Sequence, residues 1–320
     1  MTFSLRLLSL LIASISIADA QPYPSKPVRL VVGFPAGGPA DVSARILAQP
    51  LSERLGRQVI VDNRPGATGT IAAAQVAKAA PDGYTALVAT QSTNATVPYL
   101  YSKIAYDTVQ DFAAVVYVGY SPILIAVHPS LPVRSVRELI ALARARPGQI
   151  TFGTGGIGST PHMSMELFKA MARVDILPVH YKGESPAITE TVGGHVQTVA
   201  ASMAVLLPYA TAGKLRGLAV STARRAALAP QIPTVSESGL KGYETTSWQG
   251  IVVPVATPRA IIQKLNGETV QALFDPAVKG QFLKLGVETV GDTPEQFSEF
   301  LKSENARWGK LVRQLGLRAD

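Results

Sequence analysis

The segment 28–41, VRLVVGFPAGGPAD, combines residue types suited to holding an anion. The aliphatic and β-branched run Val28–Val32 predicts a buried parallel strand. Gly37 and Gly38 then allow a tight turn and a close approach of the backbone to a ligand. Pro39 suits the first helical position, and the free amides and dipole at a helix start favour negative charge. Because the lysine of the Walker phosphate motif is absent, we expect a small anion such as a carboxylate.

Three further runs of glycine or small polar residues each follow a predicted strand. They are RPGATGT at 64–70, TQSTN at 90–94 and TGGIGSTPH at 154–162. Strands that alternate with helices predict parallel sheets, and open sheets of this kind bind ligands beyond the carboxyl ends of their strands. We therefore expect these loops to converge on one ligand site.

The N-terminus has the pattern of a secretory signal peptide. Arg6 precedes an apolar run at 7–17, and Ala18-Asp19-Ala20 forms a small-x-small cleavage site before Gln21. This run is too short to span a membrane, and no later segment has the roughly 18 apolar residues that a span needs. The chain has no cysteine, which excludes disulfide and thiolate chemistry. The sequence thus predicts an exported, periplasmic protein that builds its own core.

Composition and motif spacing argue against several classes of protein. The net charge of +8 favours anionic partners, but the basic residues are scattered and lack interleaved aromatics, so nucleic acid is not expected. No G-x-S-x-G nucleophile elbow is present, which disfavours a hydrolase. Metal-ligand spacing such as H-E-x-x-H is absent around the four histidines, so no metal and no cofactor are expected. These histidines are His128, His162, His180 and His195.

The length of the mature chain, about 300 residues, predicts two domains. Apolar runs containing proline at 115–130 and 247–257 flank a self-contained alternation of helices and strands. We therefore predict two α/β lobes joined by a hinge that the chain crosses twice. The expected division is a signal peptide at 1–20, a first domain at 21–123 and 250–320, and a second domain at 124–249.

Taken in order, the motifs resemble one family. They include KPVRLVVGFPAGGPAD, VIVDNRPGATG, PDGYTALV, STPHMSMELFK, VHYKGESPAITETVGGHVQ and PTVSESGLKGYETTSWQG. Over essentially all of its mature length the chain is similar to substrate-binding proteins of the tripartite tricarboxylate transporter, the Bug or TctC group. The resemblance implies a periplasmic-binding-protein-like fold in which each lobe is a mostly parallel sheet flanked by helices. It also implies a monomeric receptor that closes over a small organic acid and presents it to a membrane permease.

The resemblance further implies how the acid is held. Loops of the first lobe would bind one carboxylate, largely through backbone groups and bridging water, and the second lobe would complete the site. The ligand-binding residues implied in this way are Phe34, Ala36, Gly37, Gly38, Asp41, Gly66, Thr68, Gly69, Gln91, Ser92 and Thr93 in the first lobe, and Gly156, Ser159, Thr160, His162, Lys182 and Ser202 in the second.

Some of these positions leave alternatives open. Asp41 could either touch the ligand or only stabilise the first turn of its helix. Ala200-Ala201-Ser202 stands where many relatives carry a run close to Phe-Asp-Ser. Losing that acid removes a partner for an ammonium group, which favours di- or tricarboxylates, including aromatic ones, over amino acids. Pro161 replaces the usual small polar residue before His162, so the donor set of that loop stays open.

An exported α/β enzyme is the alternative from another class. Residues 153–158, GTGGIG, match the G-x-G-x-x-G dinucleotide fingerprint between a predicted strand and a helix. That fingerprint requires an acid at the end of the next strand. Asp175 precedes the next strand, which ends at His180, so the pattern is incomplete. The sequence therefore favours a binding protein over a dehydrogenase.

Overall fold

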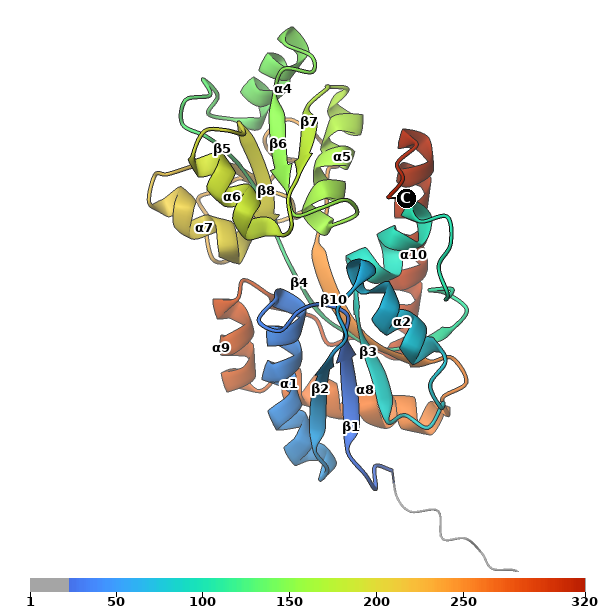
Figure 1. Ribbon diagram of the computed structural model, residues 1–320. Helices are drawn as coiled ribbons and strands as arrows, with labels where there is room; N and C mark the ends of the chain where they lie inside the picture. The colour runs from blue at the N-terminus through green and yellow to red at the C-terminus, as the bar shows by residue number, and fades with distance from the viewer. Residues whose placement is uncertain (1–22, 320) are drawn as a thin grey trace, which may run out of the picture.

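A computed structural model describes residues 23–319, and the predicted signal peptide lies outside this range. The described chain forms two sheets, each in its own lobe (Figure 1). The first sheet has the order β11(Glu288–Thr289), β4(Phe112–Ser121), β10(Ser247–Pro254), β3(Thr85–Thr90), β1(Val28–Val32), β2(Val59–Asn63). The second has the order β7(Leu177–His180), β6(Thr151–Thr154), β8(Thr198–Ser202), β5(Ile123–Val127), β9(Arg216–Val220).

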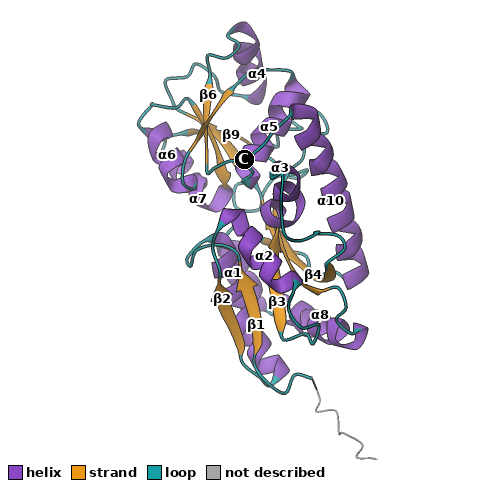
Figure 2. Ribbon diagram, turned by 45° about the vertical axis from the view of Figure 1, so that its right-hand side comes forward, coloured by secondary structure: helices purple, strands orange, loops and turns teal. Residues whose placement is uncertain are grey.

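Helices flank both sheets, as predicted (Figure 2). Those of the first lobe are α1(Pro39–Leu55), α2(Thr70–Ala77), α3(Val97–Leu100), α8(Arg259–Leu273), α9(Pro276–Lys284) and α10(Pro294–Leu315). Two short turns, η1(Ala67–Gly69) and η2(Ser92–Thr96), precede α2 and α3. Those of the second lobe are α4(Val136–Ala145), α5(Thr160–Ala172), α6(Glu184–Val192) and α7(Met203–Thr211).

Each sheet combines a parallel part with antiparallel crossover strands. Strand β1 pairs in parallel with β2 and β3, and β6 pairs in parallel with β7 and β8. The crossover strands β10 and β5 are antiparallel to their neighbours and lie inside the sheets rather than at an edge. The sheets are therefore mixed, because a chain that leaves a lobe and returns must pair strands in both directions. The sequence patterns predict mostly parallel sheets and give no sign of this antiparallel pairing.

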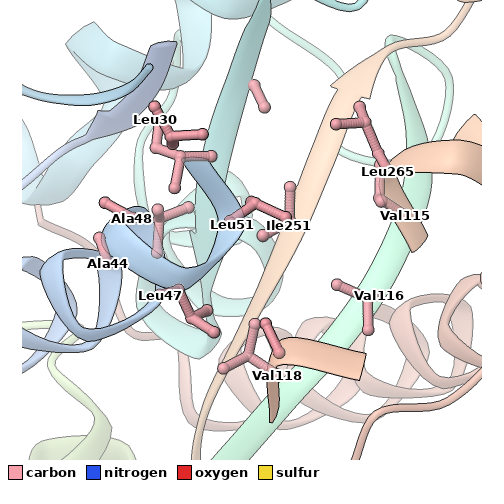
Figure 3. Packing of buried hydrophobic residues seen from close by; sticks show 14 of the residues in the cluster. Leu30, Ala44, Leu47, Ala48, Leu51, Val115, Val116, Val118, Ile251 and Leu265 are labelled. Carbon is pink, nitrogen blue, oxygen red and sulfur yellow. The ribbon is translucent and has the colours of Figure 1, made fainter. Parts of the chain in front are cut away.

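The core of the first lobe follows from its apolar pattern. Alternate residues of β1 face α1, whose Leu47 and Leu51 are almost fully buried against the sheet. Figure 3 shows Leu51 beside Ile251 of β10, with Val116 and Val118 of β4 in the same cluster. Burial of these side chains stabilises the lobe by roughly 1.5–3 kcal/mol for each large aliphatic residue. The core thus fixes the start of α1 relative to the carboxyl end of β1.

The chain changes sheet at Pro122 and again just before Ser247. Ser121 pairs with Ser247 on the first-lobe side, and Ile123 pairs with Ser202 on the second. The domain boundaries predicted from the sequence, after residues 123 and 249, lie within a few residues of these two changes of sheet. The division into domains remains a prediction. Two paired strands thus connect the lobes, and they lie in the middle of the molecule (Figure 1).

A buried acid joins the crossover to the last helix. Trp248, in β10, and Trp308, in α10, are both almost fully buried. Their indole N–H groups donate hydrogen bonds to the same Oε2 atom of Glu304, at 2.9 and 2.8 Å. Buried carboxylates are stable only when such donors satisfy them. The pair of indoles therefore fixes α10 against the start of β10.

Candidate functional site

The carboxyl ends of the parallel strands in both lobes lie next to the crossover. Thr90, the last residue of β3, is opposite Gln249, two residues after β10 begins. Ser202, the last residue of β8, is opposite Ile123, the first residue of β5. The loops that follow the parallel strands of one lobe therefore face those of the other (Figure 1). Because ligands of open α/β sheets bind at carboxyl ends, these two opposed edges form the candidate site.

On the first edge, Asp41 holds the glycine loop in place. Its Oδ2 atom accepts the Gly37 N–H at 2.8 Å, and its two oxygens accept Arg45 Nε at 3.0 Å. Asn63 Nδ2 donates to Asp41 Oδ1 and also to the carbonyl oxygen of Phe34. Although burial opposes ionisation of Asp41, the hydrogen bonds from Arg45, Gly37 and Asn63 lower its pKa. Asp41, itself 1 % exposed, thus organises the loop from behind.

The loop in front of α1 presents backbone rather than side chains. Gly37 has φ +81°, and a Cβ placed there would meet no atom within 4 Å. Ala36 and Gly37 are exposed, and Gly38 caps α1 without a side-chain hydrogen bond. The first amides of a helix have no intrahelical partner, which leaves those of Ala40 and Asp41 available. With the helix dipole, they make this helix start suitable for a carboxylate.

The loop between β2 and α2 has an unusual backbone. Four successive residues have positive φ: Gly66 at 144°, Ala67 at 44°, Thr68 at 54° and Gly69 at 89°. Non-glycine residues adopt such angles rarely, and strained backbone of this kind concentrates at functional sites. Thr93 Oγ1 donates to the Thr68 carbonyl oxygen at 3.0 Å, which helps to hold the loop. This loop starts next to α1, because Asn63 at the end of β2 bonds to Asp41, and Gly69 lies close to Gly33 directly after β1.

The polar run after β3 differs from the expected open loop. Residues Ser92–Thr96 form a π-helical turn, and Gln91, Ser92 and Thr93 are buried. Their side chains bond mainly to each other and to the nearby chain, for example Gln91 Nε2 to Thr96 Oγ1 at 2.6 Å. The sequence showed only that the run is polar. These internal hydrogen bonds allow the run to be helical and buried instead.

The second edge contains the start of α5. Ser159 caps this helix, and its Oγ accepts the backbone N–H of His162. Thr160 Oγ1 donates across the lobes to Gln91 Oε1 at 2.7 Å and lies 3.4 Å from Ser92 Oγ. Gly156 has φ +123°, and its carbonyl oxygen accepts Ser159 Oγ. The structure thus brings Thr160 of the second lobe together with Gln91 and Ser92 of the first.

The ring of His162 is almost fully buried and packs against rings of its own lobe. Its Nδ1 accepts the Gly158 N–H at 3.2 Å, and its ring packs against His180 at 4.9 Å between centroids. Burial, with His180 and Lys169 nearby, lowers the pKa of His162 to about 3, so the ring is neutral. It lines a cavity of about 720 Å³ that α5 and β7 form with the segment that follows α10, at Leu317 and Arg318. His162 therefore supports the loop of the second edge from behind.

The remaining predicted residues lie around α6 and α7. Lys182 is exposed, and Ser202 is buried at the start of α7. Ser202 donates two hydrogen bonds to Glu184, from its N–H to Oε2 at 2.9 Å and from its Oγ to Oε1 at 3.0 Å. Burial raises the pKa of Glu184, and the two Ser202 hydrogen bonds oppose that rise. Glu184 is not among the predicted site residues, although an acid directly after Gly183, in the loop that follows β7, was a signal for it.

Other types of site find less support in the described residues. Between residues 23 and 319, no group of three or more histidine, aspartate or glutamate side chains is placed to hold a metal ion. No helix in that range is long and apolar enough to cross a membrane. The 153–158 glycine run does connect β6 to α5, but Asp175 precedes β7. The acid that a dinucleotide site requires is therefore not at the end of β7.

Comparison with known proteins identifies the family. The sequence profile of the tripartite tricarboxylate transporter family receptor matches residues 43–317. The chain belongs to this family. It is 36% identical over 320 residues to the protein BugT of Bordetella pertussis, covering 99% of this chain and 98% of BugT. The sequence analysis identified the family correctly.

Solved structures of similar receptors have the same fold. The R. palustris protein Rpa4515 with adipate is 38% identical, with a TM-score of 0.82, and the match covers 92% of this chain and 99% of that one. MatC of Rhodopseudomonas palustris with bound malate is 29% identical, with a TM-score of 0.79 over 91% and 100% of the two chains. These comparisons confirm the two-lobed α/β fold of a solute-binding receptor.

Proposed function

We propose that this receptor is a periplasmic, non-catalytic protein that captures a small organic acid between its two lobes. The acid would be a di- or tricarboxylate, with aromatic acids included. The receptor would then deliver it to the permease of a tripartite tricarboxylate transporter. The opposed carboxyl edges carry this proposal, because the first edge presents free amides at the start of α1 beside the positive-φ loop 66–69. Structures of relatives with adipate and malate support a carboxylate ligand.

The proposed binding mode divides the ligand between the edges. One carboxylate would lie at the start of α1, held by backbone amides and water, while the remainder reaches Ser159 and Thr160. Both edges are engaged at once only when the lobes are close. Ligand binding should therefore favour the closed arrangement, since a ligand shifts a conformational equilibrium by its difference in affinity for the two states.

A thermal-shift panel of organic acids, followed by calorimetry, tests this proposal. At concentrations well above its dissociation constant, a true ligand should raise the melting temperature in proportion to the logarithm of its concentration. Solution scattering should show a smaller radius of gyration with the ligand, and mass spectrometry should recover the ligand unchanged. Chemical turnover of the bound acid would contradict a non-catalytic receptor, and loss of binding in chelator would reveal a metal requirement.

A transport assay tests the partner. Cells that lack this receptor but retain the cognate permease should fail to take up the acid that the panel identifies. Uptake at the wild-type rate without the receptor would contradict its role in delivery.

A further inference from the structure

We infer that Glu184 determines ligand specificity at the second edge by requiring a hydrogen-bond donor on the part of the ligand that reaches it. The inference rests on the proposed function, because it concerns the same site. Under it, the preferred acids have a hydroxyl or amino group besides the carboxylate held at the first edge. Glu184 would discriminate against acids that present only a second ionised carboxylate there.

Glu184 lies at the carboxyl edge of the second sheet. Glu184 is the first residue of α6, and the loop that leads to it packs against Gly155, where an added Cβ would lie 3.1 Å from the Glu184 nitrogen. Gly155 belongs to the loop between β6 and α5, and Ser202 ends β8. The side chain of Glu184 thus extends across the carboxyl ends of two neighbouring parallel strands. This is the edge that faces the first lobe.

The hydrogen bonds of Glu184 within the protein use only part of its capacity to accept. An ionised carboxylate has about four acceptor positions, and Ser202 supplies one donor to each of the two oxygens. Glu184 has intermediate exposure, and its printed hydrogen bonds use only one position on each oxygen, which leaves two positions for a ligand donor. No ion pair of the chain between residues 23 and 319 includes Glu184. A ligand donor would therefore meet an acceptor whose charge no protein cation offsets.

This acceptor should affect different ligands in opposite ways. A hydroxyl or ammonium group can donate to Glu184, whereas a carboxylate placed beside it would face a like charge in partly desolvated surroundings. The sequence argument against amino acids relied on Ala201, which has no acid. Glu184 restores a carboxylate next to Ser202 from a different element, 18 positions earlier in the chain. The acid of this edge is thus supplied by α6 rather than by β8.

Calorimetry with matched ligands tests the inference. Succinate, malate and aspartate share a four-carbon skeleton, and adipate and 2-aminoadipate share a longer one. In each series, the wild-type protein should bind the acids with a hydroxyl or amino group at least about tenfold more tightly than the unsubstituted acid, as expected for a hydrogen bond to a charged group. Glu184→Gln keeps the shape and can still pair with Ser202. It should reduce that ratio to about one or reverse it.

Three controls separate the explanations. Glu190→Gln changes a more distant acid of the same helix, which pairs with His195, and should leave every ratio unchanged. Glu184→Asp keeps the charge and should retain a preference for donor-bearing acids, which also covers the case in which Glu184→Gln fails to fold. The inferred role of Glu184 would be wrong if the wild type and Glu184→Gln showed the same ratio of affinities. It would also be wrong if Glu184→Asp lost all preference for acids with a hydroxyl or amino group. Neither result would contradict the proposed function. Failure of these five acids and of every acid in the thermal-shift panel to bind would overturn the proposed function.

Discussion

The two edges of the site each contain an acid, and the two acids are treated in opposite ways. Asp41 receives hydrogen bonds from a backbone amide, a guanidinium and an amide side chain, and its pKa is lowered. Glu184 receives hydrogen bonds from one serine, and its pKa is raised. Burial acts against ionisation in both. The number of donors and the nearby cation decide the difference.

This difference separates a structural acid from one that can still bind a ligand. The oxygens of Asp41 are occupied by the chain's own donors, so the carboxylate shapes the glycine loop while the backbone of that loop stays exposed. Glu184 has acceptor positions to spare at the facing edge. Of the two interpretations of Asp41 in the sequence, stabilisation of local structure is therefore the one that its contacts support.

Replacing Asp41 should have the largest effect. Asp41→Ala removes the acceptor for Gly37, Arg45 and Asn63, so we expect the free energy of unfolding to fall by about 2–3 kcal/mol. Carboxylate binding should be lost with the shape of the loop. Urea unfolding and calorimetry measure the two effects, and Glu53→Ala on the exposed face of the same helix is the control. Native affinity in Asp41→Ala would show that the loop does not hold the ligand.

A side chain at Gly37 tests the exposed face of the same glycine loop, where the ligand is proposed to bind. Gly37→Val forces a β-branched residue to adopt a φ near +81°, which should cost about 1–3 kcal/mol of stability. No atom of the protein obstructs the new Cβ, so the loss of binding should exceed what the loss of stability explains. Thermal melts and calorimetry provide both values. If Gly37→Val folds and binds normally, the anion site lies elsewhere.

The pH dependence of stability should separate the two acids. The lowered pKa of Asp41 gives stability that is present above its ordinary pKa of 3.8 and is lost as the pH falls through the folded value. The raised pKa of Glu184 gives stability that is complete below its ordinary pKa of 4.5 and is lost as the pH rises through the folded value.

Replacing each acid by its amide tests the opposite pH dependence that the two acids give to the free energy of unfolding. At pH 7, Asp41→Asn should lower the free energy of unfolding, and Glu184→Gln should raise it or leave it unchanged. Both differences from the wild type should shrink when the pH falls below about 4. Urea unfolding between pH 3 and 8 gives the profiles. Profiles of the same sign for both variants would contradict the contrast between the two edges.

Thr160 tests the contact between the edges. Thr160→Ala removes the hydroxyl that donates to Gln91, and a hydrogen bond of this kind contributes about 1 kcal/mol. We expect affinity to fall by up to about tenfold, because the closed arrangement loses a contact between the lobes. Calorimetry measures the change, and Thr189→Ala on the exposed side of α6 should have no effect. An unchanged affinity would mean that this bond forms equally in both arrangements.

Ser202→Ala should have the smallest effect. The backbone N–H of residue 202 still donates to Glu184, so only one of the two hydrogen bonds is lost. Affinity for donor-bearing acids should change by about two- to threefold, less than 1 kcal/mol. The order of preference among malate, aspartate and succinate should remain. A reversed order would show that Ser202, rather than Glu184, selects the ligand.

Most elements were predictable because their signals are local. The apolar run Val28–Val32, the glycines after it and the capping pattern at Thr293 each specify their own structure within a few residues. The loops at the two edges were predictable for the same reason, since they follow strands. Hydrophobic patterning therefore sufficed for the lobes and for the edges of the sheets that form the candidate site.

The missed features depend on contacts between distant residues. Asp41 and Asn63 are 22 positions apart, Glu184 and Ser202 are 18 apart, and Thr160 and Gln91 are 69 apart. A polar residue in the sequence does not show which partner satisfies it, so the buried turn at 91–96 resembled an open loop. The antiparallel pairing of β10 and β5 likewise depends on the path of the whole chain.

The shared carboxylate of Glu304 has a consequence for spectroscopy. The chain has two tryptophans, and both indoles bond to this one acid, so tryptophan fluorescence comes from a single buried environment. Trp248 is in a strand that connects the lobes. A change in emission when an acid is added would therefore indicate repacking beside the crossover strands, because neither indole is exposed enough to meet the ligand solution directly. Unlabelled protein can thus report on the connection between the lobes.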